Sequence, residues 1–222
     1  MAVIHQTDLK PSKLELLTSW LPSRAWYSGS DAGGPRLAKA GGFRLDDPEG
    51  EVGMEFMVVT DTAGAEPSTY LVPLTYRGAP LDGAEHALVG TMEHGVLGRR
   101  WAYDGCHDPV LVAQLLALIE GRVQAQDQNV SDTPDPDVTR SCTADGLAPA
   151  QYTAVDDKEG TALRAADGTV LRLHRLLRPA ATDDVLAALP PSASGHVAGS
   201  WRAADGARAR GLFAVLNAGS RA

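Results

Sequence analysis

The segment that most limits the possible fold is PVLVAQLLALIE (109–120), which has both the start and the stop signals of a helix. Asp108 can accept hydrogen bonds from free backbone N–H groups, and Pro109 at the first helical position loses nothing by lacking its own. Gly121 follows the last turn and ends the helix. Strand-like segments lie before and after this helix, so the order of elements predicts an α+β fold with an antiparallel sheet.

Four segments before this helix have the residue pattern of β-strands. They are EVGMEFMVV (51–59), TYLVPLTYR (69–77), HALVGTMEH (86–94) and RRWAYDG (99–105). Pro73 predicts an edge strand or a bulge, because proline cannot donate to a strand ladder. Upstream, PSKLELLTSW (11–20) predicts a short amphipathic helix, whereas the Gly- and Pro-rich residues 28–42 predict a turn-rich connector.

The second half of the chain has the signals of two β-hairpins. An Asp-Gly pair at 167–168 and another at 205–206 each separate two strand-like segments, and the first pair predicts a type I′ turn. Residues 182–189 predict a short helix capped by Thr182. Residues 122–150 are polar and rich in Pro and Asp, so they predict a linker or a long surface loop.

Charge and targeting signals limit the partners and the location. The 28 acidic and 20 basic residues give a formal charge of −8, whereas a protein that binds a phosphate backbone needs a basic face. The four arginines that come closest to such a face predict a solvated strand surface instead: Arg164, Arg172, Arg175 and Arg178. No apolar run has the length of a signal peptide or a membrane span. We therefore expect a cytoplasmic protein with reduced Cys106 and Cys142, no membrane association and no nucleic-acid partner.

No motif indicates a catalytic, cofactor or metal site. The sequence has no GxxxxGK[ST] loop, no GxGxxG after a strand, no GxSxG elbow and no HExxH pair. The nearest metal-like set is Cys106, His107 and Asp108, but adjacent side chains diverge and Asp108 already caps a helix. Trp26, Trp101 and Trp201 are the candidate interface or ligand aromatics, with core anchoring as the alternative.

The order of short motifs in the first half resembles the maltokinase N-terminal cap family. LPSRAWYSG (21–29) is similar to the arginine–x–aromatic–aromatic entry of that cap. The segments similar to the remainder of the cap are YLVPLTYRGAP (70–80), ALVGTMEHGVLG (87–98) and RRWAYDGCHDPVLVAQLLALI (99–119). The resemblance implies an antiparallel sheet curled on a helix, with a cystatin-like topology.

The second half resembles the N-lobe of actinobacterial maltokinase-type kinases. DGTVLRLHRLLRP (167–179) is similar to the strand that carries the ATP-anchoring lysine, and the segments HVAGSW (196–201) and GLFAVLN (211–217) are similar to the two strands that lead to the hinge. The implied fold is a cap followed by a kinase N-lobe-like antiparallel sheet with a short helix. The implied division is a cap at 1–121, a linker or loop at 122–150 and an N-lobe-like β-region at 151–222.

The sequence departs from the kinase family at the positions that hold the nucleotide in that family. Arg172 stands at the lysine position as a vestigial nucleotide-site residue, and its planar fork is not equivalent to an ammonium group. Leu186 stands near the place of the acidic partner, and KEGTALR replaces the expected phosphate loop. The sequence has no HGDxH-type catalytic loop and no DFE-type metal triplet, and it stops after the hinge-like strand, so we expect no kinase activity from this chain alone.

Three functions are consistent with these observations. The first is a non-catalytic cap-like protein that acts as a binding or regulatory module near trehalose, maltose or glycogen metabolism, with a protein partner or self-association expected and a sugar ligand allowed. The second is a sensor of a sugar or nucleotide that binds between cap and lobe. The third is the N-terminal part of a sugar kinase that a separate C-lobe completes.

Overall fold

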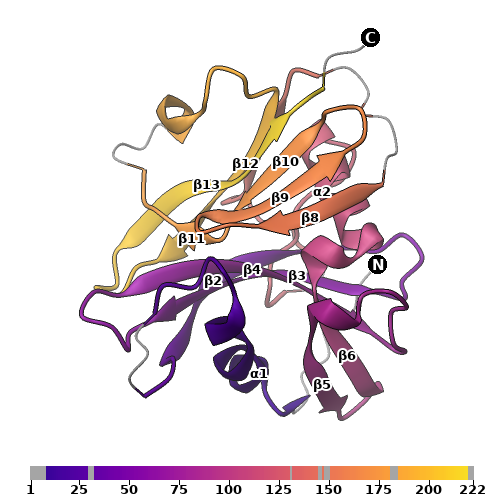
Figure 1. The fold of residues 1–222 in the computed structure, drawn as a ribbon, viewed down its shortest axis with the longest axis vertical. Coiled ribbons are helices and arrows are strands. Elements are labelled where there is room, and N and C mark those ends of the chain that lie inside the picture. The colour runs from indigo at the N-terminus through magenta and orange to yellow at the C-terminus, as the bar shows by residue number, and fades with distance from the viewer. Residues whose placement is uncertain are drawn as a thin grey trace.

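The computed structural model describes residues 9–29, 33–130, 132–144, 147, 151–180 and 185–219. Within them, antiparallel strands join in one curled sheet of order β1-β5-β6-β4-β3-β2-β12-β13-β10-β9-β8, with β11 paired to β4 and β7 paired to β12 (Figure 1). The first-half strands are β1 (Leu9–Lys10), β2 (Leu37–Leu45), β3 (Gly53–Asp61), β4 (Ser68–Arg77), β5 (Leu88–His94) and β6 (Gly98–Asp104). The second-half strands are β7 (Thr139–Cys142), β8 (Tyr152–Asp156), β9 (Gly160–Ala165), β10 (Val170–His174), β11 (Leu176–Leu177), β12 (Gly195–Arg202) and β13 (Arg208–Asn217).

Two α-helices pack on this sheet within the described residues. Helix α1 (Lys13–Trp20) begins with a complete capping box between Ser12 and Glu15. Helix α2 (Pro109–Glu120) has the expected ends, since the Asp108 side chain accepts from the Val110 N–H and Gly121 is left-handed with φ of 80°. The sequence prediction of an α+β, sheet-rich fold is confirmed. In the described residues neither helix is long and apolar enough to cross a membrane.

The two faces of the first-half sheet bury different clusters. One face packs on α1 and the adjacent loop through Leu17, Trp26, Met57 and Val72. The opposite face belongs to the larger core, which the second-half strands and α2 share. This core includes Phe43, Phe56, Leu111, Leu115, Leu163, Leu171 and Phe213. The rings of Phe43 on β2 and Phe56 on β3 stack with centroids 4.4 Å apart. The Phe43 ring also lies 6.1 Å from the ring of Phe213 on β13, so β2 meets the second half through an aromatic contact.

Several expected elements differ from the structure. The expected connector at 28–42 overlaps β2, which pairs with β3 and meets β12 where Gly41 faces Trp201. A Cβ on Gly42 would lie 2.1 Å from the Phe56 carbonyl oxygen, so the glycines there allow close strand approach. The expected helix at 182–189 is a 3-10 helix at Val185–Ala188, and Thr182 lies outside the described residues.

Pro73 does not mark an edge strand, because β4 is paired on both sides. Residues Leu74–Arg77 pair with β6, whereas Thr69 and Tyr70 pair with β11 on the same side of β4. Pro73 lies between these two stretches, so its missing N–H breaks no hydrogen bond there.

The segment expected to be a linker is attached to the sheet where the structure describes it. Gln126 exchanges backbone hydrogen bonds of 2.9 Å with Arg44, and β7 pairs along β12. Ala125 is buried in the core. The proposed division at 121 and 150 stays a prediction, as do the cystatin-like and N-lobe-like arrangements.

Candidate functional site

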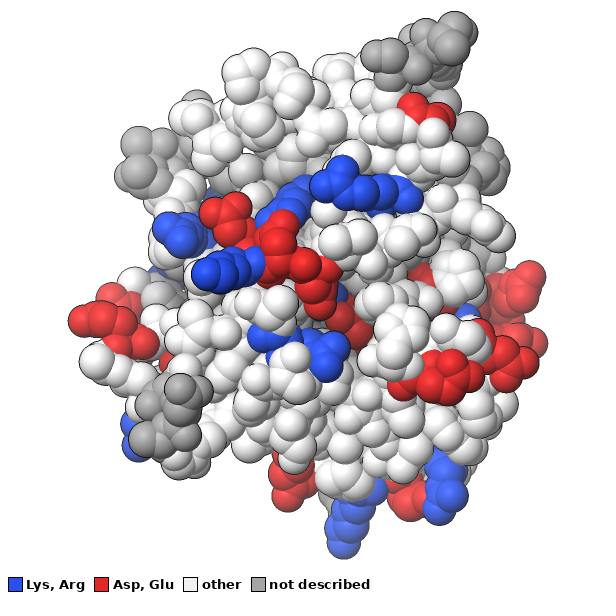
Figure 2. Space-filling view, viewed as in Figure 1, with Lys and Arg blue, Asp and Glu red and all other residues white. Residues whose placement is uncertain are grey.

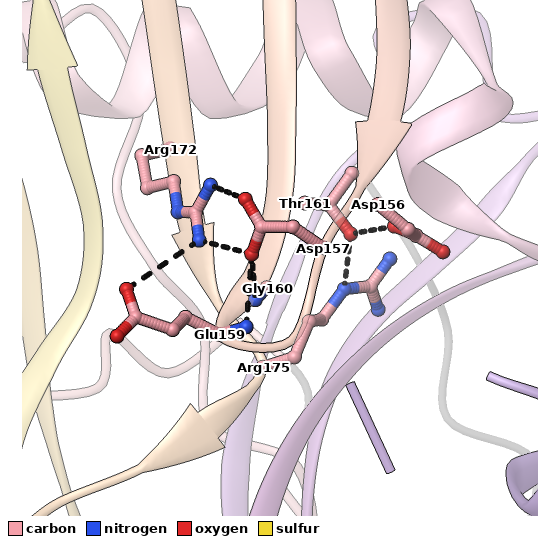
Figure 3. A network of polar contacts seen from close by, with 7 residues as sticks. All are labelled: Asp156, Asp157, Glu159, Gly160, Thr161, Arg172 and Arg175. Atoms are coloured by element: carbon pink, nitrogen blue, oxygen red, sulfur yellow. Dashed lines mark hydrogen bonds and ion pairs between the residues drawn. The ribbon is translucent and has the colours of Figure 1, made fainter. Parts of the chain in front are cut away.

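A buried polar network joins the first-half sheet to the second half. Arg175 lies between β10 and β11 with none of its surface exposed, and its Nη2 donates to both carboxylate oxygens of Asp104 on β6 at 2.6 Å. Its Nε donates to the Thr161 hydroxyl at 2.8 Å, and that hydroxyl donates to Asp156 at 2.6 Å (Figure 3). The two halves therefore share a desolvated ion pair that is 71 residues apart in sequence.

The surroundings of Arg175 stabilise its charge. Burial lowers the pKa of this guanidinium, but attraction to Asp104 and the hydrogen bonds to it outweigh burial and raise the pKa above its ordinary value. The guanidinium carbon also lies 5.0 Å from the centroid of the Trp26 ring, in a cation–π contact. The Arg175 carbonyl oxygen accepts from the Leu71 N–H at 2.9 Å. The expectation of a solvated arginine face is therefore wrong at Arg175.

Arg172 makes a separate ion pair at the surface. Its Nη1 and Nη2 both donate to the Asp157 carboxylate, the latter at 2.6 Å, and Glu159 lies 3.9 Å away (Figure 3). The hydrogen bonds from Arg172 hold the pKa of Asp157 well below its ordinary range. Figure 2 shows basic and acidic side chains adjoining one another across the middle of this face, rather than a continuous basic surface.

The candidate aromatics are placed differently from one another. Trp26 and Trp201 are buried, 1% and 3% exposed, and belong to the two main clusters. Trp101 is partly buried against Ala84 and Tyr103. The core alternative therefore describes Trp26 and Trp201, whereas Trp101 keeps part of its surface open.

A cavity of about 700 Å³ is lined in part by Cys106, whose backbone N–H donates to the Asp104 carboxylate of the buried pair. Helix α2, the 3-10 helix Gly105–His107 and β8 line it. His86 and His107 meet at its edge with ring nitrogens 3.1 Å apart, and burial lowers the pKa of His107. Gln114 and Tyr152 also line it, and the Gln114 Oε1 is buried without a hydrogen-bond partner among the described residues. The cavity therefore has an imidazole pair at its edge and an unpartnered amide oxygen buried in its wall.

Asp108 lines this cavity in addition to capping α2. Arg77 on β4 makes two hydrogen bonds of 2.7 Å to the Asp108 carboxylate through Nε and Nη2. Cys106 is buried beside it, and burial raises the pKa of its thiol above the ordinary value. Of the three residues noted in the sequence as metal-like, Asp108 caps α2 and pairs with Arg77, and Cys106 is a buried, protonated thiol. Only the His107 imidazole is left as a possible metal ligand.

Residues 20–108 match the family model of the maltokinase N-terminal cap domain. This part of the chain is similar to that domain, and residues 20–108 are called the cap domain below. The match begins at the end of α1 and ends at the residue that caps α2. No curated protein matched the chain. The resemblance noted for the first half is confirmed within the cap domain, whereas the N-lobe-like resemblance of the second half stays a prediction.

The structure brings forward functional roles that the sequence did not predict. Asp104 on β6 and Arg175 in the second half carry no local signal for pairing, since only the register of β4, β6 and β11 brings them together. Gln114 could have been noticed in the sequence, because it is a polar residue that interrupts the apolar run of α2. Among the described residues, six large apolar side chains are exposed: Leu88, Val96, Leu97, Val130, Val155 and Leu186. They come from separate strands and loops and do not lie on one strand face. A partner surface stays a prediction.

Proposed function

We propose that the chain is a non-catalytic binding module whose small ligand occupies the cavity between the cap domain and the second half. The observation that carries the proposal is the cavity itself, whose volume of about 700 Å³ lies within the range of small-molecule sites. The His86–His107 pair at its edge is a polar group that a ligand can contact, and the buried Gln114 Oε1 is an unpartnered acceptor that a turn of the side chain would present to a ligand. The buried Arg175–Asp104 pair joins β6 to the segment between β10 and β11 near this cavity.

The geometry around Arg172 supports a role without phosphoryl transfer. In kinases the lysine at the matching position contacts nucleotide phosphates and pairs with a helix carboxylate. In this chain both terminal nitrogens of the Arg172 guanidinium donate to the carboxylate of Asp157, which lies in the turn between β8 and β9. A nucleotide phosphate would have to displace this two-point pair, and Arg does not reproduce the point charge of a lysine.

The ligand classes to test follow from the name of the cap family and from the polar lining of the cavity. Maltose and trehalose present hydroxyl groups that can hydrogen-bond to imidazole and amide groups. ATP is the comparison ligand because the second half resembles a kinase N-lobe. We propose a sugar as the first choice, because hydroxyl groups can both donate to and accept from amide and imidazole groups.

Titration calorimetry with maltose, trehalose and ATP tests this function. We expect one sugar to bind saturably, and His86→Ala to weaken binding about tenfold by removing one hydrogen-bonding group of the site. His94→Ala is the matched control, because His94 lies on β5 and does not line this cavity. Silence for all three ligands, or equal effects of the two variants, would contradict the proposal.

A further inference from the structure

A second cavity of about 350 Å³ lies on the α1 side of the cap-domain sheet, away from the junction. Its lining includes Lys13, Glu55, Tyr76, Met92, Leu97 and Arg100. Lys13 is the first residue of α1, Glu55 and Tyr76 lie on β3 and β4, and Arg100 lies opposite Met92 in the β5–β6 pair. Helix α1 and each of the strands β1 to β6 therefore contribute to one pocket.

Glu55 is a buried carboxylate with acceptor capacity left over. It is 5% exposed, and its Oε2 accepts from the Lys13 ammonium and from the Tyr76 hydroxyl at 3.0 Å. Its Oε1 accepts from Gln128 alone among the described residues, at 3.4 Å. A carboxylate oxygen accommodates about two donors, so Oε1 can accept a ligand hydroxyl.

The environment keeps the Glu55 carboxylate charged. Burial raises the pKa of Glu55, but the charge and hydrogen bond of Lys13, with smaller contributions from the Lys39 charge and the Tyr76 hydrogen bond, together outweigh burial and lower the pKa below its ordinary value. Burial and the Glu55 charge raise the pKa of Tyr76 well above its ordinary value. At neutral pH the tyrosine hydroxyl therefore donates to a charged carboxylate.

Arg100 places a positively charged hydrogen-bond donor in the same cavity as the Glu55 carboxylate. Its guanidinium has five N–H donors, and no hydrogen bond or ion pair joins it to another residue of the described chain. The adjacent Arg99, by contrast, pairs with Glu93 at 2.9 Å and does not line the cavity. An unpaired guanidinium in a pocket is suited to a carboxylate or phosphate group.

The spacing of these groups limits the shape of a ligand. Glu55 is on β3 and Arg100 is on β6, and β4 lies between those strands. Two strand spacings make roughly 10 Å of sheet, and Arg100 lies four residues along β6 from Asp104, the residue in register with Leu74 and Glu55, which adds roughly 13 Å along the strand. The apolar side chains of Met92 and Leu97 line the same space. A ligand that reaches both polar ends must therefore be elongated, with an apolar body.

We propose that this cavity binds an elongated hydroxy acid, with its acid group on Arg100 and its hydroxyl donating to Glu55 Oε1. Lys13 remains close enough to Glu55 to order the hydroxyl end of the site. This site is separate from the junction cavity, so neither proposal depends on the other.

Three related compounds test the site by NMR titration of the isotopically labelled protein. 4-(4-Hydroxyphenyl)butanoate has both polar ends, 4-phenylbutanoate lacks the hydroxyl, and 4-(4-hydroxyphenyl)butan-1-ol lacks the acid. We expect the first to bind most tightly and to shift amide signals of β3, β5 and β6. Arg100→Met should weaken both acids about tenfold or more and leave the alcohol unchanged.

Two further variants separate this site from a general charge effect. Arg99→Met removes the same charge from the neighbouring residue and should leave all three affinities unchanged. Glu55→Gln should weaken the hydroxy acid and not 4-phenylbutanoate; Arg100→Met gives an independent test if that variant does not fold. Equal weakening by the two arginine variants would overturn the proposal, and so would amide shifts confined to the junction cavity.

Discussion

Replacing Asp104 by alanine is expected to lower the free energy of unfolding by about 3–5 kcal/mol. The cause is the uncompensated charge left on Arg175, which is fully buried and has no second carboxylate among its direct hydrogen-bond partners in the described chain. Urea unfolding at neutral pH measures the change. Because this pair joins the cap domain to the second half, both halves should lose stability together.

Two companion variants separate the buried pair from a general loss of charge. Asp157→Ala breaks the surface pair with Arg172 and should have a much smaller effect, because exposed ion pairs contribute little. The double variant with Asp104→Leu and Arg175→Met removes both charges and should recover part of the stability. Equal losses for Asp104→Ala and Asp157→Ala would contradict this account of the junction.

Replacing Phe43 by alanine is the second change with a large expected effect, also about 3–5 kcal/mol. Phe43 on β2 is fully buried, and its ring stacks on Phe56 and lies 6.1 Å from the ring of Phe213 on β13. The substitution leaves a cavity in the core that both halves share. The unfolding midpoint should fall while the curve stays a single transition.

Tryptophan fluorescence and far-ultraviolet circular dichroism, recorded on the same urea series, check this prediction. The matched control is Val155→Ala, since Val155 on β8 is 47% exposed and its truncation should change the stability by no more than about 0.5 kcal/mol. Two separate transitions in the Phe43 variant would show that the halves unfold independently.

Local signals predicted the individual elements well. The Asp108, Pro109 and Gly121 signals place α2 at the observed bounds, because capping depends on adjacent residues alone. Both predicted hairpins form, but at the first one only Gly168 has positive φ, whereas a type I′ turn needs it at both central residues. The Gly168 N–H donates to the Ala165 carbonyl oxygen instead, as in a three-residue loop with a bulge.

The contacts between distant segments could not be predicted in this way. Glu55 belongs to a segment whose alternation predicts one solvated face, but α1 and its loop cover that face and bury the carboxylate. Arg175 follows an exposed-looking basic series, yet the register of β11 on β4 places it beside Asp104. Both outcomes depend on tertiary packing, which a pattern within one strand does not contain.

The sequence predicts single residues of the candidate sites but not the partners that packing brings to them. Arg172 was located by its strand position, and the structure adds Asp157 as the partner that closes its fork. Trp26 and Trp201 were singled out as aromatics, but burial in two cores gives both a packing role. Unsatisfied or spare hydrogen-bonding capacity makes site candidates of Gln114, Glu55 and Arg100. That capacity depends on the three-dimensional neighbours of each side chain, which the sequence does not give.

Transfer of labelled γ-phosphate from ATP to maltose tests the central claim of a binding module without catalysis most directly. The purified chain and its Arg172→Lys variant should both incorporate no label above a blank without protein, because the residue change alone does not supply a catalytic base or a metal ligand. Label transferred to maltose in proportion to the protein concentration, and lost when Arg172 or Asp157 is replaced by alanine, would contradict the claim.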